Sequence, residues 1–133
     1  MELEQQVCSL ELAKRLKELG VKQESLFTWV RHLDKENVTY KIVILGNKGW
    51  TNYFAGGFDN KEVGEMFSAF TVAELGEMLP VHTNFPQRYN DGLWWCEQNK
   101  IEMEDGACYG HNSEADARAA MLIYLLENKL ITL

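Results

Sequence analysis

The last 21 residues of the chain, SEADARAAMLIYLLENKLITL, combine a helix start signal, an apolar middle and a helix stop signal. Ser113 is a residue type that caps the free amides of a helix, and Asp116 stands three positions later, where a carboxylate meets the positive helix end. Asn128 is predicted to leave the helix in a left-handed conformation. The eight consecutive apolar residues 119–126 cover more than two turns on every side, so this helix must be surrounded by protein. It is the predicted core element.

The first part of the chain predicts one helix and a hairpin. Residues 9–19, SLELAKRLKEL, form an amphipathic pattern that ends at Gly20, which is typical of a short helix packed along one stripe. Two β-rich runs follow at 25–33 and 38–45, and the turn-forming segment DKEN joins them as an antiparallel pair. Residues 50–55 are a third strand or an extended loop.

A second helix is predicted by its start signal. Thr71 and Glu74 have the spacing of a capping box, in which a hydroxyl and a carboxylate satisfy each other's backbone amides. Phe70 and Leu75 are spaced as a hydrophobic staple, which fixes how the chain enters the helix. We therefore expect a helix over residues 71–79.

The remaining segments complete a fold of the α+β class. Residues 81–92 are rich in loop formers, and residues 93–98 and 101–104 predict a second hairpin. The predicted order is α-β-β-(β)-α-β-β-α in a single domain, residues 1–133. Turns this short favour an antiparallel sheet of four to five strands, with helices packed mainly on one face and the final helix lying across it.

Composition places the protein in the cytoplasm. The chain has 133 residues, of which 46% are hydrophobic and 25% charged, as in a soluble globular domain. No apolar run reaches the roughly 18 residues that a membrane span needs, and the N-terminus lacks the pattern of a secretion signal. The three cysteines, Cys8, Cys96 and Cys108, are an odd number without close pairing, which indicates reduced thiols.

The charge distribution argues against nucleic acid as a partner. The net charge is −7, and residues 51–133 hold 13 acidic but only 5 basic groups, whereas residues 1–50 hold 7 acidic and 8 basic groups. Binding to phosphate requires the opposite sign, because affinity comes from cations that displace counterions. We expect neither a nucleic-acid partner nor a membrane partner.

Metal and thiol chemistry have weak support in the sequence. His82, Cys96, Cys108 and His111 are soft ligands, but only Cys108 and His111 have the close spacing of a zinc ligand pair. The same two residues stand near the start of the last helix, where a thiolate is stabilised. Two residues in a glycine-flanked loop are more often solvent-exposed, so we predict no catalytic residue, no metal and no cofactor.

Aromatic residues on the predicted strands suggest a surface for protein binding. Trp94 and Trp95 are adjacent, so one points into the core and the other away from it. Large rigid side chains beside acidic groups are suited to anchoring a protein partner, although helices that cover both sheet faces explain the tryptophans more simply. The candidate binding residues are Trp50, Tyr53, Trp94, Trp95, Glu102 and Glu104.

Three blocks of the chain, residues 7–30, 68–80 and 113–131, resemble a family of small uncharacterised proteins encoded by bacteriophages and prophages of gut bacteria. They match in order and spacing, through the early helix, the segment AELGEMLP and the closing helix. The family has no established activity, so the resemblance implies only a phage-type protein made in a bacterial cytoplasm.

These observations give three alternatives for function. The leading hypothesis is a non-enzymatic module that binds a host or phage protein through the aromatic and acidic surface. The second is a small enzyme or ligand-binding or metal-binding protein that uses residues 82–111. Its candidate residues are His82, Arg88, Tyr89, Cys108 and His111. The third is a structural protein that associates with itself as a homodimer.

Overall fold

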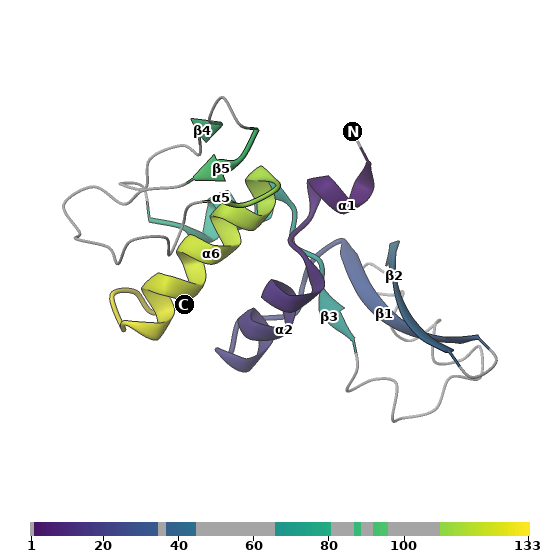
Figure 1. Cartoon of the computed structure of the whole chain (residues 1–133). Coiled ribbons are helices and arrows are strands. Elements are labelled where there is room, and N and C mark those ends of the chain that lie inside the picture. The colour runs from purple at the N-terminus through teal and green to yellow at the C-terminus, as the bar shows by residue number, and fades with distance from the viewer. Residues whose placement is uncertain (1, 35–36, 45–65, 81–86, 89–91, 96–109) are drawn as a thin grey trace.

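The computed structural model describes residues 2–34, 37–44, 66–80, 87–88, 92–95 and 110–133. The elements follow in the order α1 (Leu3–Gln6), α2 (Leu10–Glu18), β1 (Phe27–Asp34), β2 (Asn37–Ile44), β3 (Phe67–Ser68), α5 (Val72–Met78), β4 (Gln87–Arg88), β5 (Trp94–Trp95) and α6 (Glu114–Glu127) (Figure 1). The fold is α+β, with helices and an antiparallel sheet, as predicted. The predicted order lacks α1, and β3 and β4 lie at residues where no strand is predicted, whereas β5 lies within the predicted strand 93–98.

The described strands form two separate sheets. β1 and β2 form the predicted antiparallel hairpin, and β3 adds to the other edge of β1, giving the order β2-β1-β3. β4 and β5 form a two-stranded ribbon of their own, at the opposite side of the helices in Figure 1. In the described residues the larger sheet therefore has three strands, fewer than the predicted four to five. Predicted strands 50–55 and 101–104 lie outside the described residues.

The β4–β5 ribbon contains a strand that the sequence does not predict. β4 lies within the segment 81–92, which the composition predicts as a loop, and it becomes a strand by pairing with β5. Gln87 pairs with Trp95 and Arg88 with Trp94. Two residues carry too short a pattern to predict a strand, since their extended conformation depends on a partner elsewhere in the chain.

Helix α6 is the core element, as predicted, but it packs mainly against other helices. Its neighbours are α5, α2, α1 and the β5 strand, so it does not lie across the three-stranded sheet as expected (Figure 1). Trp29 and Phe67 reach from the sheet to the core. The fully buried side chains of α6 include Ala115, Ala117, Ala119, Met121, Leu122 and Leu125.

Among the described helices, none has the length and apolar character needed to cross a bilayer. The longest, α6, has 14 residues and carries Glu114, Asp116, Arg118 and Glu127. Its apolar side chains face protein instead.

Helix α2 is attached to the sheet through its lysines. Ala13 and Leu16 are buried on the predicted apolar stripe. The ammonium of Lys14 lies 5.1 Å from the centre of the Tyr40 ring. Lys17 lies 5.0 Å from the centre of the Phe67 ring and donates to the Met66 carbonyl oxygen at 2.9 Å. These lysines therefore stabilise the packing of helix on sheet.

Both long helices end in the same hydrogen-bond pattern, a Schellman motif. At the end of α2, Gly20 has φ +88°, and the amide of Val21 donates to the Leu16 carbonyl oxygen. At the end of α6, the left-handed residue is Lys129, with φ +55°, and the amide of Leu130 donates to the Leu125 carbonyl oxygen. The prediction of a left-handed Asn128 is wrong by one residue. The φ of Asn128 is −90°, and its side-chain amide donates to Tyr124 O at 2.8 Å.

These two ends give a matched stability prediction. Lys129→Gly is expected to raise the free energy of unfolding by about 0.5–1 kcal/mol, because a side chain is strained at positive φ and glycine is not. Gly20→Ala is expected to lower it by about 1 kcal/mol for the same reason. A β-carbon at Gly20 would meet no atom within 4 Å, so that loss is conformational. Urea denaturation measures both, and a Lys129→Gly protein no more stable than wild type contradicts the assignment.

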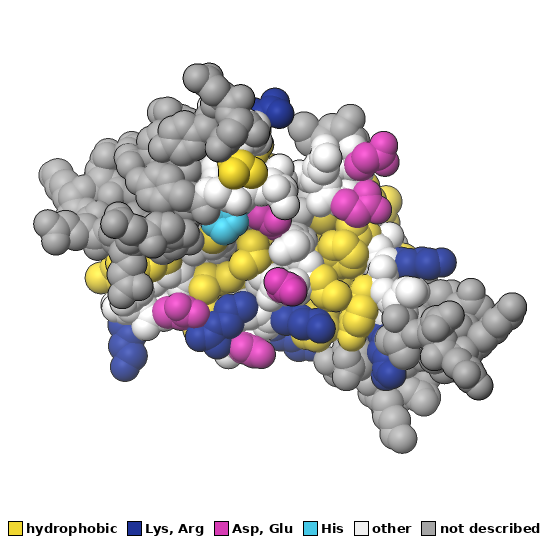
Figure 2. All heavy atoms as spheres, viewed as in Figure 1, with side chains coloured by type: hydrophobic (Ala, Val, Ile, Leu, Met, Phe, Trp, Pro, Cys, Tyr) yellow, Lys and Arg dark blue, Asp and Glu magenta, His cyan; other side chains and the backbone are white. Residues whose placement is uncertain are grey.

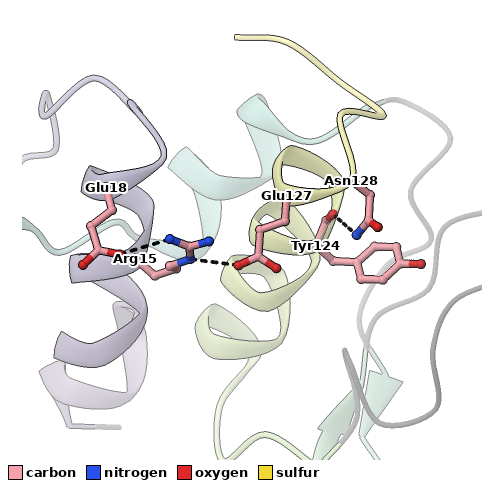
Figure 3. A network of polar contacts seen from close by, with 5 residues as sticks. All are labelled: Arg15, Glu18, Tyr124, Glu127 and Asn128. Carbon is pink, nitrogen blue, oxygen red and sulfur yellow. Dashed lines mark hydrogen bonds and ion pairs between the residues drawn. The ribbon is translucent and has the colours of Figure 1, made fainter.

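An exposed ion-pair network connects α2 to the end of α6 (Figure 3). Arg15 donates through Nε to Glu127 at 2.8 Å and through Nη1 to Glu18 at 3.1 Å. Glu127 and then Glu18 raise the pKa of the Arg15 guanidinium. Solvent screens such pairs, so the network contributes little to stability. Charges of both signs are intermixed on this face, over α2 and the end of α6 (Figure 2).

Candidate functional site

The predicted aromatic surface is only partly within the described residues. Trp50, Tyr53, Glu102 and Glu104 lie outside them, as does the side chain of Trp95. Trp94 is half-buried and packs against the hydrophobic core beside α6. Trp94 therefore contributes to the core.

The structure brings together two residues of the alternative site. Trp94 pairs with Arg88 on one side and with His111 on the other. The amide of Trp94 donates to His111 O at 2.7 Å, and the amide of His111 donates back at 3.1 Å. Neighbouring strands lie about 4.8 Å apart, so the backbones of Arg88 and His111 are roughly 10 Å apart. His82, Tyr89 and Cys108 lie outside the described residues.

A small depression adjoins this row of residues. Its volume is about 220 Å³, and it is lined by Gln5, Val72, Arg88, Trp94 and residues 112–114. Arg88 is exposed, and its Nε donates to Gly92 O at 3.3 Å. This lining offers an aromatic face and a guanidinium to a small ligand.

His111 adjoins the buried part of the same region. Its Nε2 atom is buried and has no hydrogen-bond partner among the described residues. Burial raises the pKa of the Asp116 carboxyl, and the Ser9 amide and the charge of His111 act in the opposite direction. In the described part of the chain, no group of three or more histidine, cysteine or acidic side chains is placed to hold a metal ion. The proposed ligands His82, Cys96 and Cys108 lie outside that part.

Cys8 lies where three elements meet. Its amide donates to Phe70 O at 2.9 Å, and its carbonyl oxygen accepts from Trp29 Nε1 at 3.0 Å. The next amide, of Ser9, donates to the Asp116 carboxylate at 2.6 Å. Cys8 is free and fully buried, as predicted for a structural thiol. Burial raises the pKa of its thiol to about 12, aided by the negative charge of Asp116, so Cys8 is a poor nucleophile.

The raised pKa of the Cys8 thiol predicts that the protein loses stability at alkaline pH. The unfolded thiol ionises above about pH 9, whereas the native thiol stays protonated up to about pH 12. The stability that comes from this difference in pKa is therefore complete below about pH 9, and it is lost as the pH rises from about 9 to about 12. By pH 10.5 the loss is about 2 kcal/mol. In urea denaturation, the stability difference between wild type and Cys8→Ala should fall by that amount between pH 8 and 10.5, and a constant difference contradicts it.

The larger cavity is a groove between the segment that follows α2 and helix α5. Its volume is about 420 Å³, and it is only partly enclosed. Its apolar lining comes from Val21 and Phe70, which are buried, together with Met78 and Leu133. The remaining lining residues are Gly20, Lys22, Glu24, Glu74 and Glu77. We call this cavity the α5 groove.

The capping box of α5 shapes one wall of the groove. The Thr71 hydroxyl accepts from the Glu74 amide, and the Glu74 carboxylate accepts from the Thr71 amide at 2.9 Å, which confirms the predicted box. The same carboxylate accepts from the Ser25 hydroxyl at 2.9 Å and the Leu26 amide at 3.3 Å. Glu74 thus fixes α5 against the segment before β1, so this wall is preorganised.

Sequence reasoning missed the α5 groove. Its lining residues come from three separated segments, 20–24, 70–78 and Leu133, and no local pattern connects them. The one usable signal is the predicted capping box, which places Glu77 and Met78 at the end of a short helix.

The chain matches no known family model, no curated protein and no solved structure. The resemblance to small phage proteins therefore stays a prediction.

Proposed function

We propose that the protein binds another protein without catalysing a reaction, and that the α5 groove is the contact site. In line with the resemblance to phage proteins, the proposed partner is a host or phage protein in the bacterial cytoplasm. The observation that carries this proposal is a groove of about 420 Å³ with an apolar lining and exposed leucine at its edge.

The exposed leucines favour a macromolecular partner. Leu133 lines the groove and is 64% exposed, and Leu26, bound to Glu74 through its amide, is 52% exposed. Apolar side chains around a concave apolar site gain free energy when a partner removes them from water. Aromatic and aliphatic anchors in such sites provide most of the binding energy of protein interfaces.

Capture from a bacterial host lysate tests the proposal, with wild type and the double variant Met78→Gln/Leu133→Asn as baits. Both substitutions replace apolar groove side chains by neutral polar ones of similar size. We expect a protein that wild type retains and the variant loses, with both baits showing a cooperative thermal transition. Trp94→Ala and Trp95→Ala test the predicted aromatic surface in parallel, and because Trp94 packs against the core, both variants must also keep a cooperative thermal transition. Loss only with those two variants moves the contact away from the α5 groove, and equal capture by all variants contradicts both surfaces.

The row of Arg88, Trp94 and His111 supports a second candidate function, the binding of a small ligand, and the sequence adds metal binding as a variant of it. The depression beside it holds a guanidinium and an aromatic ring. Elemental analysis of the purified protein and thiol titration test this candidate. Bound metal in stoichiometric amount, or unusually high reactivity of Cys108, supports it, and the absence of both contradicts metal binding and thiol chemistry in this region. The third alternative, a homodimer, is tested by measuring mass in solution.

A further inference from the structure

The charges around the α5 groove are unequal. Glu24 and Glu77 are exposed, and in the described part of the chain neither carboxylate makes an ion pair. Lys22 is the one basic residue among the lining residues. The groove therefore offers an apolar surface beside an excess of negative charge.

Glu74 plays a different part from the other two acidic residues. Its two carboxylate oxygens accept hydrogen bonds from the Thr71 amide, the Ser25 hydroxyl and the Leu26 amide. These bonds use its lone pairs for holding α5 in place. Glu24 and Glu77 are left as the carboxylates that a partner can reach.

Resting on the proposed function, we infer that the α5 groove binds a basic, apolar segment of its partner. Leucine-like side chains of that segment contact Val21, Phe70 and Met78, while its lysine or arginine residues lie beside Glu24 and Glu77. The apolar contacts provide most of the affinity. The carboxylates select the sign of the partner's charge and speed its association, and the net charge of −7 acts in the same direction.

Two synthetic peptides test this inference by fluorescence anisotropy. Both have 14 residues in the same amphipathic pattern, one built of leucine and lysine and the other of leucine and glutamate. We expect the lysine peptide to bind wild type and the glutamate peptide to bind far more weakly. Glu24→Gln/Glu77→Gln should weaken binding of the lysine peptide about five- to tenfold. Binding should also weaken with added salt.

A charge-matched control separates the groove from the overall field. Glu4→Gln/Glu11→Gln removes the same two charges from exposed positions on α1 and α2, away from the groove, and should change the affinity less than twofold. Equal weakening by both double variants would show that the peptide follows net charge and would overturn the inference. Preference for the glutamate peptide would overturn it as well.

The two proposals fail in different ways. One outcome is that Met78→Gln/Leu133→Asn abolishes capture of a protein while Glu24→Gln/Glu77→Gln leaves the affinity for the lysine peptide unchanged. In that case the inference is wrong and the proposed function stands. If capture does not depend on the groove, the proposed function is wrong whatever the peptides do. A wild-type dimer that Met78→Gln/Leu133→Asn dissociates would assign the groove to a second copy of the chain and overturn the inference.

Discussion

Leu122→Asp is expected to abolish the cooperative thermal transition of the protein. Leu122 is fully buried in α6 and belongs to the main hydrophobic core. Truncating such a side chain costs about 2–5 kcal/mol. An aspartate adds the cost of burying an unpaired carboxylate or of protonating it, which is several kcal/mol more. The sum reaches the whole stability of a typical domain, about 5–15 kcal/mol.

Leu133→Asp is the matched control, because it makes the same chemical change at a leucine that is 64% exposed. Its transition should lie within a few degrees of wild type, since exposed substitutions rarely cost more than about 0.5 kcal/mol. Calorimetry or far-UV circular dichroism measures both variants. A Leu122→Asp protein that keeps a cooperative transition near the wild-type temperature would refute the position of α6 in the core.

The features that sequence predicts well here depend on residues close together in the chain. Ser113 accepts from the Asp116 amide at 3.1 Å, as its position three residues earlier indicates. Thr71 and Glu74 form their box for the same reason. The apolar run of α6 is buried on nearly every side, because eight consecutive apolar residues leave no polar face.

The features that sequence misses depend on distant partners. β4 is a strand only because Gln87 and Arg88 pair with β5, and a pattern of two residues does not predict that pairing. The position of α6 against α5, α2 and α1 depends on contacts between segments that are far apart in the chain. The end of α6 differs by one residue because Asn128 caps a carbonyl with its side chain, which leaves the positive φ to Lys129.

The candidate sites divide in the same way. Residue chemistry directs attention to tryptophan, cysteine and histidine, and the structure does place Arg88, Trp94 and His111 side by side. The α5 groove is assembled from ordinary residues such as Val21 and Met78, which are unremarkable in sequence. A concave surface is a property of packed elements, so it becomes visible only when the fold is known.

Glu74→Ala is expected to lower the free energy of unfolding by about 2–3 kcal/mol, which corresponds to roughly 10 °C in the thermal midpoint. The carboxylate accepts from the Thr71 and Leu26 amides and the Ser25 hydroxyl. Hydrogen bonds to a charged acceptor are stronger than neutral ones, and alanine leaves all three donors without this acceptor. Ser25, which is 5% exposed, keeps the Ala69 carbonyl oxygen as an alternative at 3.1 Å, and this limits the loss.

The control is Glu77→Ala, one turn later on the same helix, where the carboxylate is exposed. It should change stability by less than about 0.5 kcal/mol. Thr71→Ala removes only the hydroxyl that accepts from the Glu74 amide and should cost about 1 kcal/mol. Because the two side chains form one capping box, the loss in Thr71→Ala/Glu74→Ala should be smaller than the sum of the single losses. If Glu74→Ala is no more harmful than Glu77→Ala, then Glu74 does not hold α5 against the segment before β1, and the preorganised wall of the α5 groove is lost with it.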